Sequence, residues 1–260
     1  MKTRAFSLFI AMTGMIALTA MSPAIADDTV MRLASLEWSP YVGSQLRDEG
    51  LTASIVKVTA RQIGIDTKIS YAPWSRTVQV GGTDPAYAGY FPAFYTKERE
   101  SSCYFSGILG RSIVGFAYLK KRPFDWLRLS DLQAYKIGIV QDYANGEEFD
   151  AMIKKGLLKT DTAPSDVSNL RKLLAQRIDV IVIDKNVLRQ LLITEPGLQA
   201  NRDQIEFHPQ ELTNFSMHIC FQHTERGLAM RKSFNAALEK VDIKKFENTY
   251  FKLTDAAGSR

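Results

Sequence analysis

Segments with strand patterns and segments with helix patterns alternate along this 260-residue chain. Residues 30–36 and 67–71 have strand patterns, and an apolar repeat with helical spacing covers 50–63. A short helical stretch then leads to a pair of glycines at 81–82 and a third apolar segment around 86–91. Strands that alternate with helices are typical of a parallel, doubly wound sheet, so the pattern predicts an α/β fold.

The same alternation restarts in the second half of the chain. A strand is predicted at 136–140, a helix at 146–155 with acids at its start, and a helix capped by serine at 165–176. The apolar run in 179–184 is bracketed by aspartates and suits a buried strand. A last strand at 216–221 and two further helices follow. The length allows one large domain or two small ones.

The first residues have the features of a secretion signal. Lys2 and Arg4 precede an apolar stretch at 5–21, and Ala-Ile-Ala at 24–26 is a small-x-small cleavage site. An uncleaved membrane anchor is the alternative, but the stretch is short and broken by threonine and glycine, whereas a spanning helix needs about 20 mainly apolar residues. We therefore predict a signal peptide over 1–26. No cysteine lies at the cleavage point, so we expect a soluble exported protein without a lipid anchor.

The chain contains two cysteines, Cys103 and Cys220. Paired thiols persist in the oxidising compartments that exported proteins reach, which favours a disulfide bond. Two buried free thiols that act as small apolar residues remain the alternative.

Charge and motifs argue against several functions. The formal net charge of +5 falls to +3 without the two positive charges of Lys2 and Arg4 in the predicted signal, which is too mild to indicate nucleic-acid binding. The three histidines, His208, His218 and His223, are spaced unlike zinc ligands. The sequence has no Gly-x-Ser-x-Gly motif and no phosphate-binding loop. We expect no metal, no cofactor and no hydrolase.

An ordered series of short motifs resembles the type 2 periplasmic solute-binding proteins, specifically the polar amino-acid transporter-associated family (bacterial extracellular solute-binding protein family 3). The series covers essentially the whole chain after the signal. Its members are EWSPY at 37–41, PWSR at 73–76, TKER at 96–99 leading to YFS at 104–106, and LAQRID at 174–179 ending at Asp184.

The resemblance implies a two-lobed protein. Each lobe is a mainly parallel, doubly wound sheet, two crossing strands join the lobes, and the ligand lies between them. Applied to this chain, lobe one is 27–109 with 216–260, and lobe two is 110–215. Both cysteines then fall in lobe one, on segments that could be neighbouring strands. The resemblance also implies a periplasmic monomer that delivers its solute to the membrane permease of an ABC transporter.

The resemblance assigns two charged residues to the ligand. Arg99 matches the arginine that holds the ligand's α-carboxylate, and a guanidinium fits a carboxylate with two parallel hydrogen bonds. The alternative is a surface arginine paired with Glu98 or Glu100. Asp184 matches the residue that takes the ligand's ammonium group, and its alternative role is N-cap of a helix that begins at Lys185.

Aromatic residues complete the candidate site. Trp38 and Tyr41 lie where the family places an aromatic wall, and a ring can stack on a ligand or face a cation. Trp74 and Arg76 follow the second strand, again at the end that faces the cleft. In lobe two, Tyr143 lies in the loop before a helix, whose free backbone N–H groups can bind an anion. Either aromatic pair could instead fill the core of its own lobe.

The sequence departs from the family just before the Thr-x-x-Arg motif. Amino-acid binders usually carry small or hydroxylated residues there, whereas this chain has YFPAFY at 90–95, and Pro92 has no backbone donor. Lobe two also lacks the Gly-Thr pair that opens its anion-binding loop. A more apolar or aromatic carboxylate therefore fits at least as well as an amino acid.

Three functions follow from this combination. The first is capture of a small carboxylate-bearing solute for transport, which requires a hinge motion and no catalysis. The second is a periplasmic enzyme on the same fold, a dehydratase of prephenate-like acids, with Glu37 or Asp142 as the acid. The third is a sensor subunit that presents the ligand to a membrane receptor. We expect the first.

Overall fold

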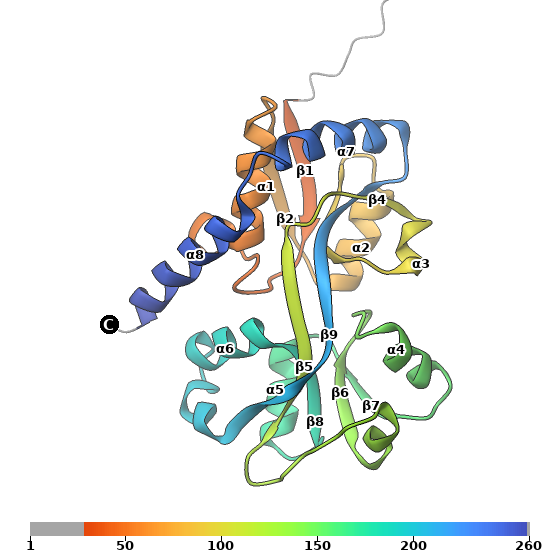
Figure 1. The fold of residues 1–260 in the computed structure, drawn as a ribbon, viewed down its shortest axis with the longest axis vertical. Coiled ribbons are helices and arrows are strands. Elements are labelled where there is room, and N and C mark those ends of the chain that lie inside the picture. Colours follow the sequence, from red (N-terminus) through yellow and green to blue (C-terminus); the bar gives the residue numbers. More distant parts are fainter. Residues whose placement is uncertain (1–28, 259–260) are drawn as a thin grey trace, which may run out of the picture.

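The computed structural model describes residues 29–258, with side chains up to residue 252. The predicted signal peptide, 1–26, lies outside the described residues. Two groups of strands and helices lie one above the other and are joined by two long strands, β5 and β9 (Figure 1). All the strands belong to one hydrogen-bonded sheet of order β2-β1-β3-β9-β5-β8-β6-β7, and β4 also pairs with β9.

Lobe one contains the N-terminal strands and the last two helices. β1 pairs in parallel with both β2 and β3, and β3 pairs antiparallel with β9. Gly50, at φ 102°, precedes α1, and a side-chain carbon there would lie 2.6 Å from the carbonyl oxygen of Tyr41, so only glycine fits. The elements are β1 (Val30–Ser35), α1 (Leu51–Arg61), β2 (Asp66–Tyr71), α2 (Trp74–Thr83), β3 (Gly89–Phe94), α3 (Lys97–Glu100), β4 (Cys103–Phe105), α7 (Glu225–Leu238) and α8 (Ile243–Gly258).

Lobe two repeats the alternation. β6 pairs in parallel with β7 and β8, and β8 pairs antiparallel with β5. All five residues of β8 are buried, as expected for a central strand with helices on both sides. The predicted serine cap is confirmed, because the Ser165 hydroxyl accepts the backbone N–H of Ser168. The elements are β6 (Lys136–Val140), α4 (Glu147–Lys154), β7 (Lys159–Ala163), α5 (Asp166–Leu174), β8 (Val180–Asp184) and α6 (Lys185–Thr194).

The strands that cross between the lobes are β5 (Gly110–Leu119) and β9 (Ile205–Gln222). They pair antiparallel, and their register shifts between Val114 and Gly115 and again between Gly115 and Ala117. Pro209, which has no N–H to donate, lies in the segment opposite the second shift. The strand predicted at 216–221 is therefore only the end of a much longer strand. The division of the chain into lobes stays a prediction: its boundary at 110 coincides with the start of β5, and its boundary at 216 falls inside β9.

The glycine pair does not end the second helix, contrary to the prediction. α2 continues through Gly81 and Gly82 to Thr83, and β3 begins at Gly89. A side-chain carbon at Gly81 would lie 2.6 Å from Cβ of Tyr90. The glycine allows α2 to pack closely on β3, and this close contact outweighs its poor helix propensity.

The predicted disulfide is confirmed. Cys103 on β4 and Cys220 on β9 are bonded, with Cα atoms 5.4 Å apart. The two strands are antiparallel neighbours, so the bond joins segments that the sheet already places together.

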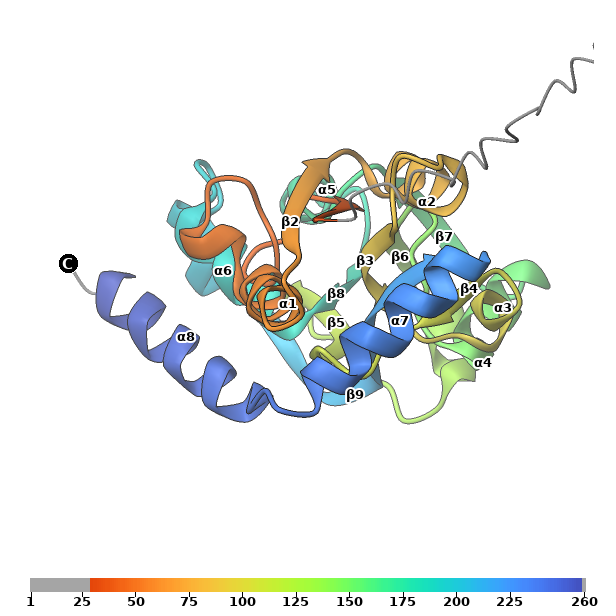
Figure 2. The same cartoon turned by 90° about the horizontal axis from the view of Figure 1, so that it is seen from above.

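α8 lies beside α1 and extends beyond it, at the outer edge of lobe one (Figures 1 and 2). Its apolar residues Phe246, Tyr250 and Phe251 pack partly against the core. Within the described part of the chain, neither α8 nor any other helix has the length and apolar character needed to cross a membrane.

Candidate functional site

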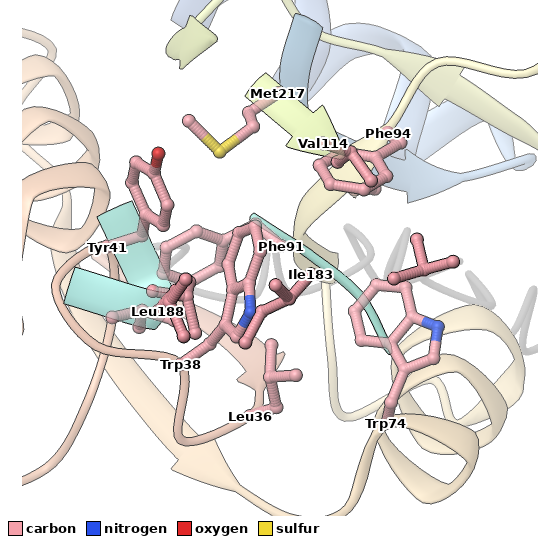
Figure 3. Packing of buried hydrophobic residues seen from close by; sticks show 14 of the residues in the cluster. Leu36, Trp38, Tyr41, Trp74, Phe91, Phe94, Val114, Ile183, Leu188 and Met217 are labelled. Carbon is pink, nitrogen blue, oxygen red and sulfur yellow. The ribbon is translucent and has the colours of Figure 1, made fainter. Parts of the chain in front are cut away.

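A pocket lies where the carboxyl ends of the lobe-one strands meet lobe two. The space between its lining atoms is about 280 Å³, a volume that includes the open solvent at its mouth. Figure 3 shows Trp38 beside Tyr41, with Trp74 and Phe94 further along the cluster. The eight lining residues are Leu36, Trp38, Trp74, Pro92, Phe94 and Arg99 from lobe one, and Tyr143 and Ala144 from lobe two.

Arg99 is the charged residue of the pocket wall. The hydroxyl of Thr96 caps α3 and accepts the backbone N–H of Arg99. One guanidinium nitrogen donates to the carbonyl of Phe94 at 3.2 Å, and the guanidinium carbon lies 5.6 Å from the centre of the Trp74 ring. Burial lowers the pKa of Arg99, but an arginine stays protonated in proteins.

Arg99 forms no ion pair with any described side chain. Its sequence neighbour Glu98 instead lies 3.8 Å from Lys154 of lobe two. Among the described residues, no hydrogen bond or ion pair joins the guanidinium to Glu98 or Glu100, although the charges of Glu98 and Asp150 act to raise the pKa of Arg99. A half-buried cation without a hydrogen-bonded carboxylate is well suited to bind an anionic ligand.

Trp74 forms the wall next to Arg99 and also contacts lobe two. Its indole N–H donates to the carbonyl of Asp142 at 3.0 Å, and its ring meets Tyr143 edge to face at 6.2 Å. The hydroxyl of Ser75 donates to the carboxylate of Asp142 at 2.5 Å. The start of α2 is thus bonded to the loop that carries Tyr143.

Trp38 and Tyr41 lie together but have different surroundings. Their ring centres are 4.7 Å apart, and Trp38 also meets Phe94 of the pocket wall edge to face. Tyr41 is only 2% exposed and does not line the pocket. Its hydroxyl donates to Asp184 at 3.1 Å and accepts from the amide of Asn186 at 3.1 Å.

Asp184 caps α6 and is nearly inaccessible, at 3% exposure. One carboxylate oxygen accepts the backbone N–H groups of Asn186 and Val187, at 2.7 and 2.8 Å. The other accepts the hydroxyls of Ser112, at 2.7 Å, and Tyr41. Burial raises the pKa of Asp184, although these hydrogen bonds act to lower it. The structure places this residue in the capping role, outside the pocket wall.

Three other candidates do not line the pocket. Arg76 is exposed and donates to Gln79 of its own helix. Glu37 accepts the backbone N–H of Ser44 within its own loop. Asp142 bonds Ser75, as described above. The structure brings together Arg99, Trp38, Trp74 and Tyr143, and leaves Arg76, Tyr41 and Asp184 outside the pocket wall.

Two backbone N–H groups of the loop before α4 already have hydrogen-bond partners. The backbone N–H of Tyr143 donates to the carbonyl of Val140, and that of Asn145 donates to the carboxylate of Asp150. Burial raises the pKa of the Tyr143 hydroxyl well above its usual value, so the side chain stays neutral.

Asp166 is a feature of the site region that the sequence analysis did not identify. It begins α5 and is 7% exposed. Burial and the charge of Asp184 raise its pKa to about 7, while a hydrogen bond from the Trp38 side chain acts to lower it. Its position after a serine cap indicated only a helix start. Leu36 and Phe94 were also missed, although their place at the carboxyl ends of strands is a usable signal.

In the described chain no group of three or more histidine, cysteine, aspartate or glutamate side chains is placed to hold a metal ion. No protein-family model matches the sequence, and comparison with curated proteins gives no significant match.

Solved structures show the same fold. An ancestral arginine-binding protein bound to arginine superposes with a TM-score of 0.70 at 16% identity, covering 88% of this chain and 97% of its own. The GluR0 ligand-binding core from Nostoc punctiforme in complex with L-glutamate gives 0.66 at 20% identity, covering 87% and 98%. An ancestral amino-acid-binding protein, a precursor of cyclohexadienyl dehydratase, gives 0.67 at 15% identity, covering 88% and 95%.

The chain therefore has the two-lobed fold of amino-acid-binding proteins. More closely, it is the type 2 periplasmic binding-protein fold, with two α/β lobes and two crossing strands, and the predicted fold class is confirmed.

Proposed function

We propose that this protein captures a small carboxylate-bearing solute between its two lobes. The observation that carries the proposal is Arg99, a half-buried guanidinium without an ion-pair partner among the described side chains, in a pocket otherwise walled by aromatic and apolar groups. A carboxylate placed there would receive two parallel hydrogen bonds and neutralise the buried charge. The flat rings of Trp38 and Trp74 would contact the rest of the solute.

Capture by lobe closure is supported by the contacts between the lobes. Trp74 and Ser75 bond the loop at Asp142, and Tyr41 bonds Asp184. The two crossing strands join the lobes and provide the hinge. A ligand that touches both lobes binds the closed form better and shifts the population towards it.

We further propose that the protein is exported, works in the periplasm as a monomer, and delivers its solute to an ABC transporter permease. The disulfide supports an oxidising compartment. A substrate-binding protein of an amino-acid ABC transporter has the same fold, with a TM-score of 0.69 at 15% identity over 86% of this chain. The sensor role is the alternative, and a pull-down that captures a signalling receptor in place of a permease would support it.

We propose binding without turnover. None of the eight lining residues is a carboxylic acid that could protonate a leaving group, and Glu37 and Asp142 both bond elsewhere. A precursor of cyclohexadienyl dehydratase has the same fold, so a dehydratase of prephenate-like acids is the alternative. Incubation with prephenate, followed by chromatography of the products, tests it: turnover would contradict the proposal.

The direct test is a thermal-shift screen of amino acids and small carboxylates, followed by calorimetric titration of each compound that raises the midpoint. Loss of one buried bidentate ion pair weakens binding by a factor on the order of 100, so Arg99→Ala should remove the shift. Arg61→Ala, at the exposed end of α1, is the matched control and should keep it. If Arg99→Ala keeps the full shift, the carboxylate role is wrong.

A further inference from the structure

The carboxylate that the motif series assigns to a ligand ammonium group already has its hydrogen-bond partners. An ionised carboxylate accepts about four hydrogen bonds, and Asp184 receives them from two backbone N–H groups, Ser112 and Tyr41. Tyr41 belongs to lobe one, so its hydroxyl contacts Asp184 from the side on which a ligand between the lobes would lie. The side-chain amide of Asn186 donates a hydrogen bond to the same Tyr41 hydroxyl.

The pocket wall offers no replacement for this acid. Its eight residues comprise Arg99 and seven neutral side chains, most of them aromatic or aliphatic. Asp166, the other buried acid nearby, interacts with the Trp38 side chain and is not part of the wall. A ligand ammonium group would therefore leave water without a carboxylate among the lining residues to pair with, which is unfavourable.

The polar features of the pocket suit a single anionic group. Arg99 holds its guanidinium over Trp74 and bonds only the Phe94 carbonyl among the described atoms. Pro92 contributes no backbone donor to the wall. The rings of Trp38, Trp74 and Phe94 provide flat apolar surface next to that guanidinium.

We infer that the pocket selects an aromatic or apolar monocarboxylic acid that lacks an α-ammonium group, with Arg99 binding the carboxylate and Tyr41 keeping Asp184 from the ligand. This inference rests on the proposed solute-binding function and specifies its ligand class. It assigns Tyr41 a role in specificity, because its hydroxyl occupies the acid that would otherwise recognise an amino acid.

The test compares two probes that share a skeleton. 3-Phenylpropanoate and L-phenylalanine differ only in the α-ammonium group, and both are titrated into the purified protein by calorimetry. We expect 3-phenylpropanoate to bind about 100-fold more tightly, the factor expected for a buried charge without a partner. Equal or tighter binding of L-phenylalanine would overturn the inference and leave the proposed function standing.

Two further outcomes separate the inference from the proposed function. If neither probe binds but another acid from the screen binds through Arg99, the ligand class is wrong and the capture function holds. If no carboxylate binds through Arg99, both are wrong. 2-Phenylethylamine, which has the ring and the cation but no carboxylate, should not bind, and its binding would also overturn the inference.

A variant tests the role of Tyr41. Tyr41→Phe leaves the ring and removes the hydroxyl, which frees one acceptor site on Asp184. We expect the preference for 3-phenylpropanoate over L-phenylalanine to fall about 10-fold, the value of one hydrogen bond to a charged group. Tyr118→Phe is the matched control, because its hydroxyl bonds Glu206 away from the pocket. An unchanged preference in Tyr41→Phe, with the melting midpoint retained, would refute the assigned role.

Discussion

Replacing Asp166 with asparagine should change how the stability of the protein depends on pH. The side chain is 7% exposed, and burial and the charge of Asp184 raise its pKa to about 7. In the unfolded chain the same carboxyl has a pKa of about 3.9. Between these two values the folded state retains a proton that the unfolded state has lost, so rising pH favours unfolding.

The magnitude follows from the two pKa values. Well below the unfolded pKa of about 3.9, the carboxyl is protonated in both states and adds no pH dependence. From there its contribution to stability falls as pH rises, and the loss is complete once pH exceeds the folded pKa of about 7. Between pH 5 and pH 8 the free energy of unfolding should decrease by about 2–3 kcal/mol because of this group. Asparagine has the same shape and does not titrate, so Asp166→Asn should lack this decrease.

Urea unfolding followed by tryptophan fluorescence, with the disulfide intact, measures the effect at several pH values. The stability difference between Asp166→Asn and wild type should move in favour of the variant by about 2–3 kcal/mol from pH 5 to pH 8. Asp203→Asn, an exposed aspartate, is the control and should show no such trend. If the stability difference between Asp166→Asn and wild type stays constant from pH 5 to pH 8, burial does not raise the pKa of Asp166 as argued.

Three further substitutions have definite expectations. Changing Cys103 and Cys220 together to serine opens a loop of 117 residues and should lower the free energy of unfolding by about 2–5 kcal/mol, measured by urea unfolding against the oxidised wild type. Gly81→Ala should lower the melting midpoint through a cost of about 1–3 kcal/mol, because α2 contacts β3 too closely for a methyl group. Trp74→Phe removes the hydrogen bond to Asp142 and should weaken ligand binding about fivefold by calorimetry.

The order of strands and helices could be predicted because each depends on local periodicity and on caps such as Ser165. The full extent of β9 could not be predicted, because its first half is polar and contains Pro209 and is held as a strand only by pairing with β5. The continuation of α2 through Gly81 likewise depends on the close packing of this helix against β3. In both cases a tertiary contact outweighs the local preference.

In the candidate site, too, some features could be predicted from the sequence and others could not. A recognisable motif places Arg99 at the start of a short helix, and the aromatic residues Trp38 and Trp74 follow strands whose carboxyl ends face the pocket. The pairing of Tyr41 with Asp184 joins residues 143 positions apart, so no local pattern could indicate it. A short polar sequence can show that an aspartate begins a helix, but it cannot show which side chain from the other lobe completes its hydrogen bonds.

The hydrogen bonds between the lobes and the charge of Arg99 would have opposite effects on lobe closure. The hydrogen bonds from Tyr41 to Asp184 and from Trp74 to Asp142 hold the two lobes together without a ligand. Closure would also remove water from the half-buried Arg99, and a cation without a hydrogen-bonded carboxylate opposes that removal. A bound carboxylate cancels only the second effect, and a ligand shifts a conformational equilibrium only through its different affinity for the two forms. Under the proposed capture by lobe closure, the charge of Arg99 would make closure depend on an anion, and the Tyr41 contact would reduce the binding energy that this anion must supply.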